Sequence, residues 1–160
     1  MSSVMMECPL VPDLRISHPC SIFIAGATGT GKSNFIKNFI ECDAIKEGTD
    51  VIYYFMPRFE TLDITPPRGL DIYTYEGLPS QDWVDKSIEP YKDRNTLIVV
   101  DDLWSRSVES PVIEYLLTYG RRHLNLSLIF VAQNFYEKAK KAITLRYLIN
   151  KISDAFIIFN

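Results

Sequence analysis

The sequence predicts an α/β fold in which helices cover both faces of a largely parallel central sheet. Short runs of β-branched and apolar residues alternate with amphipathic stretches along the chain, as strands and helices do in α/β proteins. Two of these runs, residues 96–100 and 127–132, contain almost no polar residues. Strands of that kind are buried on both faces of a sheet, which is typical of parallel sheets covered by helices.

The first expected strand covers residues 19–25 and ends in a glycine-rich loop. A helix over residues 32–40 follows it, because apolar residues recur there on one helical face. Two further strands, over residues 50–55 and 71–75, flank a long loop over residues 56–70. The prolines and the glycine of that loop prevent it from being helical throughout.

In the second half of the chain a helix is expected to begin at Pro111 and to end at Gly120. Ser110 can cap this helix, proline is favoured at a first helical position, and glycine is favoured just past a helix end. The remaining expected elements are a short helix or turn over residues 82–88, strands over 96–100 and 127–132, a helix over 137–149 and a last strand over 155–159.

Composition indicates one soluble domain over residues 1–160. A hydrophobic content of 47% is enough for a core,. A net charge of −3 displaces few counterions from a duplex, so nucleic acid would have to be gripped by a ring of subunits or by a local basic patch. The N-terminus does not resemble a signal peptide, and no apolar run reaches the length of a membrane span. We therefore expect a soluble intracellular protein that does not contact a membrane.

The glycine-rich loop carries the pattern G-x-x-x-x-G-K-S/T, the P-loop or Walker A motif, between a strand and a helix,. Its glycines let backbone N–H groups turn toward phosphates at the positive end of a helix. Lys32 is expected to reach the β- and γ-phosphates of ATP or GTP, and the Ser33 hydroxyl to bind Mg²⁺. The expected nucleotide-binding residues are Gly26, Ala27, Thr28, Gly29, Thr30, Gly31, Lys32 and Ser33.

Two acids, Asp101 and Asp102, follow the apolar strand over residues 96–100, as in a Walker B motif. Ligands of open α/β sheets bind at the carboxyl ends of the strands. We expect Asp101 to hold Mg²⁺ through water and Asp102 to polarise the attacking water. The alternative for Asp102 is that it caps the following turn, as Asp often does after a strand.

Gln133 stands at the end of the other buried strand, over residues 127–132. Its amide could contact the γ-phosphate or the attacking water. The alternative is that Gln133 is a loop residue whose side chain forms hydrogen bonds with its own backbone. The P-loop, the two acids and Gln133 would meet at one edge of a parallel sheet, and this coincidence favours the functional interpretation.

Three arginines are candidates for an arginine finger that reaches the γ-phosphate of a neighbouring subunit. Arg121 and Arg122 follow Gly120 at a helix end, where the helix dipole favours basic residues in any case. Arg146 is a further candidate, and the sequence does not choose among them. The expected site has no obvious cation of its own chain on the far side of the γ-phosphate, which favours a finger supplied by a neighbour.

Three segments carry a family resemblance: residues 76–79 (EGLP), 97–103 (LIVVDDL) and 119–134 (YGRRHLNLSLIFVAQN). They resemble viral genome-packaging ATPases of the FtsK/HerA-type P-loop class, and most closely those of Polinton or adintovirus-like elements. The resemblance runs from the first strand to the end of the chain. Such relatives continue beyond their final strand, whereas this chain ends at Asn160, which favours a truncated C-terminus.

The resemblance implies a homo-oligomeric ring that hydrolyses ATP with Mg²⁺ and pumps double-stranded DNA into a preformed capsid. A capsid protein would be a partner, and the site of virion assembly would be the location. Lys32 and Ser33 match the P-loop of that class, Asp101 and Asp102 its acidic strand end, and Gln133 its sensor-like amide. Arg146 falls near a basic residue of such relatives, with a spacing one residue longer here.

Two other functions remain open. A nucleoside or nucleotide kinase would need an arginine-rich lid and an acceptor site, whereas the loop over residues 56–70 has Arg58 and Arg68 among mainly proline, acidic and apolar residues. A non-enzymatic nucleotide-dependent switch would not need the complete set of lysine, serine and acids that the motifs contain.

Overall fold

The computed structural model describes residues 15–133 and 155–159 of the chain. Its described strands form one six-stranded sheet in the order β3-β2-β4-β5-β1-β6, and every pairing in it is parallel. The sheet confirms the predicted fold class. The strands are β1 (Ser21–Gly26), β2 (Val51–Met56), β3 (Asp71–Glu76), β4 (Thr96–Asp101), β5 (Leu126–Ala132) and β6 (Ala155–Phe159).

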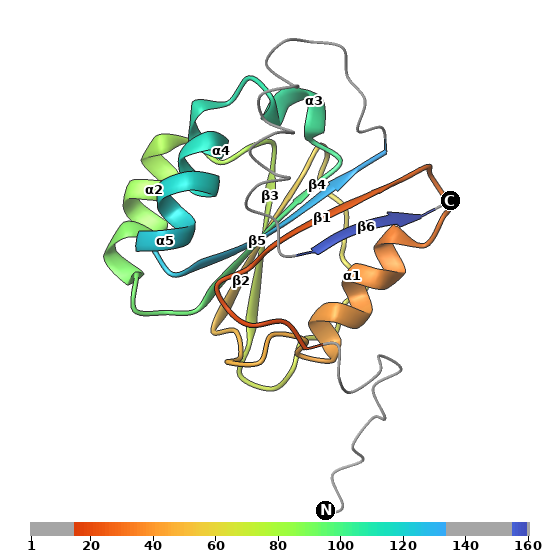
Figure 1. Cartoon of the computed structure of the whole chain (residues 1–160), viewed down its shortest axis with the longest axis horizontal. Helices are drawn as coiled ribbons and strands as arrows, with labels where there is room; N and C mark the ends of the chain where they lie inside the picture. Colours follow the sequence, from red (N-terminus) through yellow and green to blue (C-terminus); the bar gives the residue numbers. More distant parts are fainter. Residues whose placement is uncertain (1–14, 134–154, 160) are drawn as a thin grey trace, which may run out of the picture.

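Helices cover both faces of the sheet, as predicted (Figure 1). On one face the apolar side of α1 packs on alternate residues of the strands. On the other face α2, α3, α4 and the turn after α4 pack on the intervening residues. The described helices are α1 (Lys32–Glu41), α2 (Gln81–Ser87), α3 (Trp104–Ser107), α4 (Pro111–Tyr115) and α5 (Arg121–His123). A 3₁₀ turn η2 (Glu89–Tyr91) follows α2, and a π-helical turn η3 (Leu116–Gly120) joins α4 to α5.

The four internal strands explain the apolar runs in the sequence. Nearly every residue of β1, β2, β4 and β5 is buried, because each of these strands has a neighbour on both sides and helices above and below. The edge strand β3 alternates between exposed and half-buried residues instead. Burial of apolar surface is worth about 25 cal/mol per Å², so these strands contribute to the stability of the fold.

The strand order brings the predicted motifs together. β5 lies between β1, which leads into the P-loop, and β4, which ends at Asp101. In register, Ala25 is opposite Ala132 and Asp101 is opposite Val131. Because all three strands run in the same direction, the residues that follow them emerge at one edge of the sheet.

The predicted helix end at Gly120 is wrong. Ser110 caps α4 through a bond from the Ile113 N–H to its hydroxyl, as expected, but the helical path continues through η3 into α5 and stops only at His123. Gly120 has a helical φ of −60°. A Cβ there would lie 2.9 Å from Leu126 Cδ1, so this glycine serves the close packing of the helix on β5 and not a helix end.

The predicted helix over residues 137–149 lies outside the described residues. The candidate arginine finger Arg146 lies outside them too. Among the described residues, none of the helices has the length and apolar character that crossing a membrane requires.

Candidate functional site

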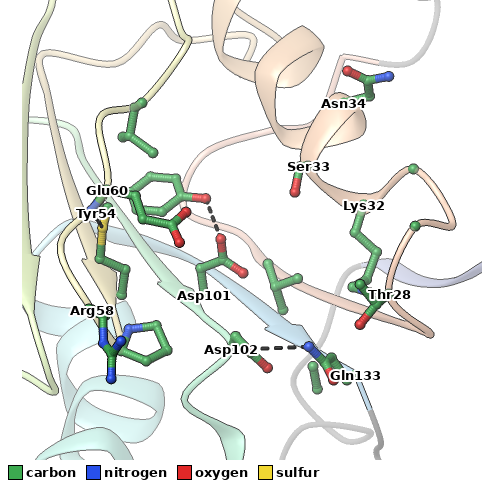
Figure 2. Close-up of a pocket in the computed structure, with 17 residues that line it drawn as sticks. Thr28, Lys32, Ser33, Asn34, Tyr54, Arg58, Glu60, Asp101, Asp102 and Gln133 are labelled. Carbon is green, nitrogen blue, oxygen red and sulfur yellow. Dashed lines mark hydrogen bonds between the residues drawn. The ribbon is translucent and has the colours of Figure 1, made fainter.

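A cavity of about 710 Å³ opens at the carboxyl ends of β2, β4 and β5, beside the start of α1 (Figure 2). A volume of this size is in the range of small-molecule and cofactor sites. Four segments contribute residues to its wall: 28–34, 54–62, 101–102 and 131–133. The cavity therefore joins the P-loop, the two acids and Gln133, as the sequence predicted, and adds a segment that the sequence analysis did not place there.

The P-loop has the backbone that anion binding requires. Gly29 and Gly31 have φ angles of 81° and 103°, which residues with a Cβ rarely adopt. Gly31 is the N-cap of α1 and offers no side chain to bond the first N–H groups of this ten-residue helix. Such N–H groups at a helix N-terminus, together with the helix dipole, form a site for phosphate.

Lys32 lies folded over its own loop. Its ammonium donates to the carbonyl oxygens of Gly26 and Ala27, the latter at 2.8 Å. The lysine is thus already beside the loop that would surround the phosphates. It would exchange these carbonyl acceptors for phosphate oxygens, which form stronger bonds with an ammonium because both partners are charged.

Asp101 is the last residue of β4 and is largely buried at the wall of the cavity. Its Oδ2 accepts a 2.7 Å hydrogen bond from the hydroxyl of Tyr54 on the neighbouring strand β2. Burial raises the pKa of the Asp101 carboxyl, the bond from Tyr54 opposes that rise, and the charge of Asp102 adds to it. Burial, and then the charge of Asp101, raises the pKa of the Tyr54 phenol, so the hydroxyl keeps its proton and remains the donor.

Asp102 occupies a different environment. Its φ of 56° is left-handed, and its N–H donates to the Val131 carbonyl at 3.0 Å, which fixes the turn after β4 against the end of β5. Its Oδ2 accepts from the Gln133 amide at 3.3 Å. The helix that follows, α3, has Leu103 at its N-cap and no side-chain cap bond.

Gln133 therefore contacts the second acid. Figure 2 shows its amide and the Asp102 carboxylate side by side at the floor of the cavity, below Lys32. Each of the two acids has its own neutral donor, Tyr54 for Asp101 and Gln133 for Asp102. Both acids line the same cavity, and each has a different partner.

Arg121 and Arg122 do not belong to this chain's own cavity. They form α5, which leads into the start of β5, whereas the cavity lies at the carboxyl ends of the strands (Figure 1). Neither residue lines the cavity. Any contact of these arginines with a nucleotide would have to be made in a neighbouring subunit, as the sequence analysis expected.

Sequence reasoning missed Tyr54, Arg58 and Glu60, which line the cavity from the end of β2 and the loop after it. The Glu60 charge contributes to the raised pKa of Asp101. Arg58 is a cation of the chain's own at the wall of the cavity, and the sequence analysis did not place it there. The rule applied to Asp101 and Gln133 would have found these residues, since β2 also ends in a polar loop at the same edge of a parallel sheet.

The residues present fit a Mg²⁺ ion that is bound together with a nucleotide. The Ser33 hydroxyl and the Asp101 carboxylate lie on facing walls of the cavity (Figure 2), and both are oxygen ligands of the kind that Mg²⁺ prefers. Among the described residues no group of three or more His, Cys, Asp or Glu could hold a metal without help. Phosphate oxygens and water would complete the octahedral shell, as is usual for Mg²⁺.

No family model and no curated protein matches this chain, but solved structures share its fold. It is similar to the DNA-packaging ATPase B204 from Sulfolobus turreted icosahedral virus, with a TM-score of 0.58 and 18% identity over 88% of this chain and 75% of that chain. It is also similar to the genome packaging NTPase B204 from Sulfolobus turreted icosahedral virus 2.

In the complex of that NTPase with AMPPCP, the TM-score is 0.55 and the identity 19%, over 88% of this chain and 73% of that chain. In its complex with ATP-gammaS, the TM-score is 0.51 and the identity 17%, over 83% of this chain and 81% of that chain. Likeness at such low identity shows the fold. The chain has the α/β fold of the P-loop NTPases.

Proposed function

We propose that this chain is a Mg²⁺-dependent ATPase that works as a homo-oligomeric ring, translocates double-stranded DNA and packages a viral genome into a capsid. The observation that carries the catalytic part is the cavity, which brings the P-loop, Asp101, Asp102 and Gln133 to one edge of the sheet. A glycine turn without function would not coincide with two acids and an amide from strands so distant in sequence.

The geometry supports a division of roles. The N–H groups of residues 27–33 surround the phosphates, and Lys32 contacts the β- and γ-phosphates. Ser33 and Asp101 hold the Mg²⁺ ion, which neutralises charge on the phosphates when it is bound. Asp102 orients the attacking water and accepts its proton. Gln133, which contacts Asp102 in the nucleotide-free chain, would help to orient the same water.

The proposal that the chain translocates and packages DNA rests on the shared fold. The similar structures belong to proteins described as a DNA-packaging ATPase and a genome packaging NTPase. The net charge of −3 favours a ring that grips DNA through small patches on several subunits over one chain that binds it alone. A capsid protein as partner follows from the same proposal.

Substitutions of the two acids test the proposed ATPase activity, and we expect the two substitutions to cause different defects. Asp102→Asn should keep nucleotide binding and lower turnover by about 10²-fold or more, the scale of a positioned base. Asparagine suits this position because it tolerates a left-handed φ such as the 56° of Asp102,. Asp101→Asn should instead weaken Mg²⁺-dependent nucleotide binding.

The measurement is phosphate release from ATP, together with nucleotide affinity as a function of Mg²⁺, in the full chain and both variants. Water is the only acceptor present, so release at a useful rate also separates an ATPase from a nucleotide kinase. Identical defects in the two variants would contradict the division of roles. No release by the unchanged chain would contradict the ATPase.

A further inference from the structure

We propose that Tyr54 is a positioning residue for the metal site: its hydroxyl holds one oxygen of Asp101 so that the other oxygen faces the Mg²⁺ ion of a bound nucleotide. No motif marks this tyrosine, and it stands 47 residues before the acid that it contacts. The inference rests on the part of the proposed function that assigns Mg²⁺ to Asp101.

The sheet register places the two side chains on one face. β2 pairs with β4, and Tyr54 lies opposite Val99. Asp101 stands two residues beyond Val99 and therefore on the same face of the sheet, diagonal to Tyr54 and within reach of a long aromatic side chain. The 2.7 Å bond between the Tyr54 hydroxyl and Asp101 Oδ2 joins them.

Packing fixes the tyrosine in that place. Tyr54 is 3% exposed and belongs to the core cluster on the α1 face of the sheet, so its hydroxyl has little freedom to follow another acceptor. Asp101, by contrast, stands where β4 ends and the cavity begins. A carboxylate at such an end is free to rotate unless a neighbour holds it, and Tyr54 is the neighbour that the structure shows.

The chemistry of the donor suits a metal ligand. A phenol is neutral, so it orients the carboxylate without neutralising the negative charge that attracts Mg²⁺. A lysine or arginine in the same place would form an ion pair and compete with the cation. A donor to one carboxylate oxygen leaves the second oxygen for the metal or its water, as partners of metal-binding carboxylates commonly do.

Tyr54→Phe tests this role, with Tyr53→Phe as its matched control. Phenylalanine keeps the buried ring and removes only the hydroxyl. Tyr53 is the adjacent residue of the same strand, is also buried, and packs its ring at 5.0 Å against Trp83 on the opposite face of the sheet. The readout is the binding of a fluorescent ATP analogue to the full chain, titrated with Mg²⁺, and a thermal melt confirms that each variant is folded.

We expect Tyr54→Phe to raise the half-saturating Mg²⁺ concentration by about 10-fold, the scale of losing a partner of a metal ligand. Binding of the analogue without Mg²⁺ should not change, and Tyr53→Phe should behave as the unchanged chain. In the Asp101→Asn background, Tyr54→Phe should add nothing, because the oxygen that it positions no longer carries the charge that binds the metal.

The inference is overturned if Tyr54→Phe matches Tyr53→Phe, or if it has the same effect with and without Asp101→Asn. It is also overturned if Asp101→Asn alone leaves the Mg²⁺ dependence unchanged. The titration requires no turnover, so a chain that binds Mg²⁺ with the analogue yet hydrolyses no ATP would contradict the proposed ATPase and leave the role of Tyr54 intact.

Discussion

Asp101 and Asp102 are adjacent in the chain, but their surroundings give them different chemistry. Asp101 is largely buried and accepts from a tyrosine, whereas Asp102 is exposed and accepts from a glutamine amide. Burial raises the pKa of the first carboxyl. The roles proposed above, Asp101 for the cation and Asp102 for the water, rest on this difference in environment.

The Lys32 ammonium is the proposed contact of the P-loop with the β- and γ-phosphates. We expect Lys32→Ala to abolish productive nucleotide binding or hydrolysis, because the P-loop over residues 26–33 would lose its only cation,. Lys86→Ala is the control, since the side chain of this lysine is 74% exposed on α2 and bonds to Asp82 on the same helix. Binding of ATP followed by calorimetry is the measurement, and wild-type affinity and turnover in Lys32→Ala would contradict the assignment.

The partly buried, charged carboxylate of Asp101 should lower the stability of the nucleotide-free chain. Its raised pKa means that the folded state binds the proton more tightly than the unfolded state, so the ionised form is destabilising above that pKa. Asp101→Asn removes this cost and keeps an oxygen that can accept from Tyr54. Its melting temperature at neutral pH should exceed that of the unchanged chain by about 2–4 °C for each kcal/mol relieved.

This gain should shrink as the pH falls through the raised pKa and vanish below the ordinary aspartate value of about 3.9, where both states are protonated. Thermal melts of the metal-free chain and the variant across pH measure it. A variant that is less stable at neutral pH, or one with a gain independent of pH, would contradict this account of Asp101.

The sequence predicted the residues of the site that carry a motif or end an apolar run, namely the P-loop, the two acids and Gln133. It did not predict which donor meets which acid, because Tyr54 and Asp101 are far apart in the chain and meet only through the pairing of β2 with β4. It also missed Arg58 and Glu60, since a proline-rich loop gives no sign of the cavity that it borders.

At the scale of elements, apolar runs located the strands to within a few residues, because buried parallel strands leave an unbroken apolar signal. No local sequence pattern predicted the order of these strands in the sheet. The path through η3 into α5 was missed for another reason: glycine can end a helix or allow close packing, and only the contact with Leu126 distinguishes the two.

Gly26 tests the junction between β1 and the edge strand β6. It lies opposite Phe159 in the register, and a Cβ there would come within 2.8 Å of the Phe159 carbonyl oxygen. Gly26→Ala must therefore displace backbone, and we expect a loss of about 1–3 kcal/mol, typical of overpacking. Thermal or urea unfolding measures this loss, and a variant as stable as the unchanged chain would contradict the described pairing of these two strands.

At the scale of the molecule, the cavity opens at one end of the sheet and α5 stands at the other. A finger arginine from α5 would therefore act on a neighbour in a ring, whereas Arg58 borders the chain's own cavity. An arginine that acts on a neighbouring subunit and one that acts on its own subunit predict different hydrolysis rates in mixtures of variant subunits.

We expect subunits with Lys32→Ala, mixed with subunits that lack the finger arginine, to recover part of the hydrolysis, because each supplies what the other lost. Arg121→Ala, Arg122→Ala and Arg146→Ala are each mixed in turn. A finger is worth about 10³–10⁵ in rate in other P-loop enzymes, so partial recovery is measurable. Mixtures with Arg58→Ala should recover nothing if Arg58 serves its own site, and the absence of recovery in every mixture would contradict fingers supplied by a neighbour.

Phosphate release per subunit, measured with and without long double-stranded DNA at matched low salt, tests the central claim most directly. The account predicts that the rate rises with DNA and with protein concentration, since both favour assembly of the ring, and that Lys32→Ala shows no release under any condition. Short single-stranded DNA at equal phosphate concentration is the control for charge alone. A rate that is independent of both DNA and protein concentration would contradict the motor, and equal release by Lys32→Ala would contradict the ATPase site itself.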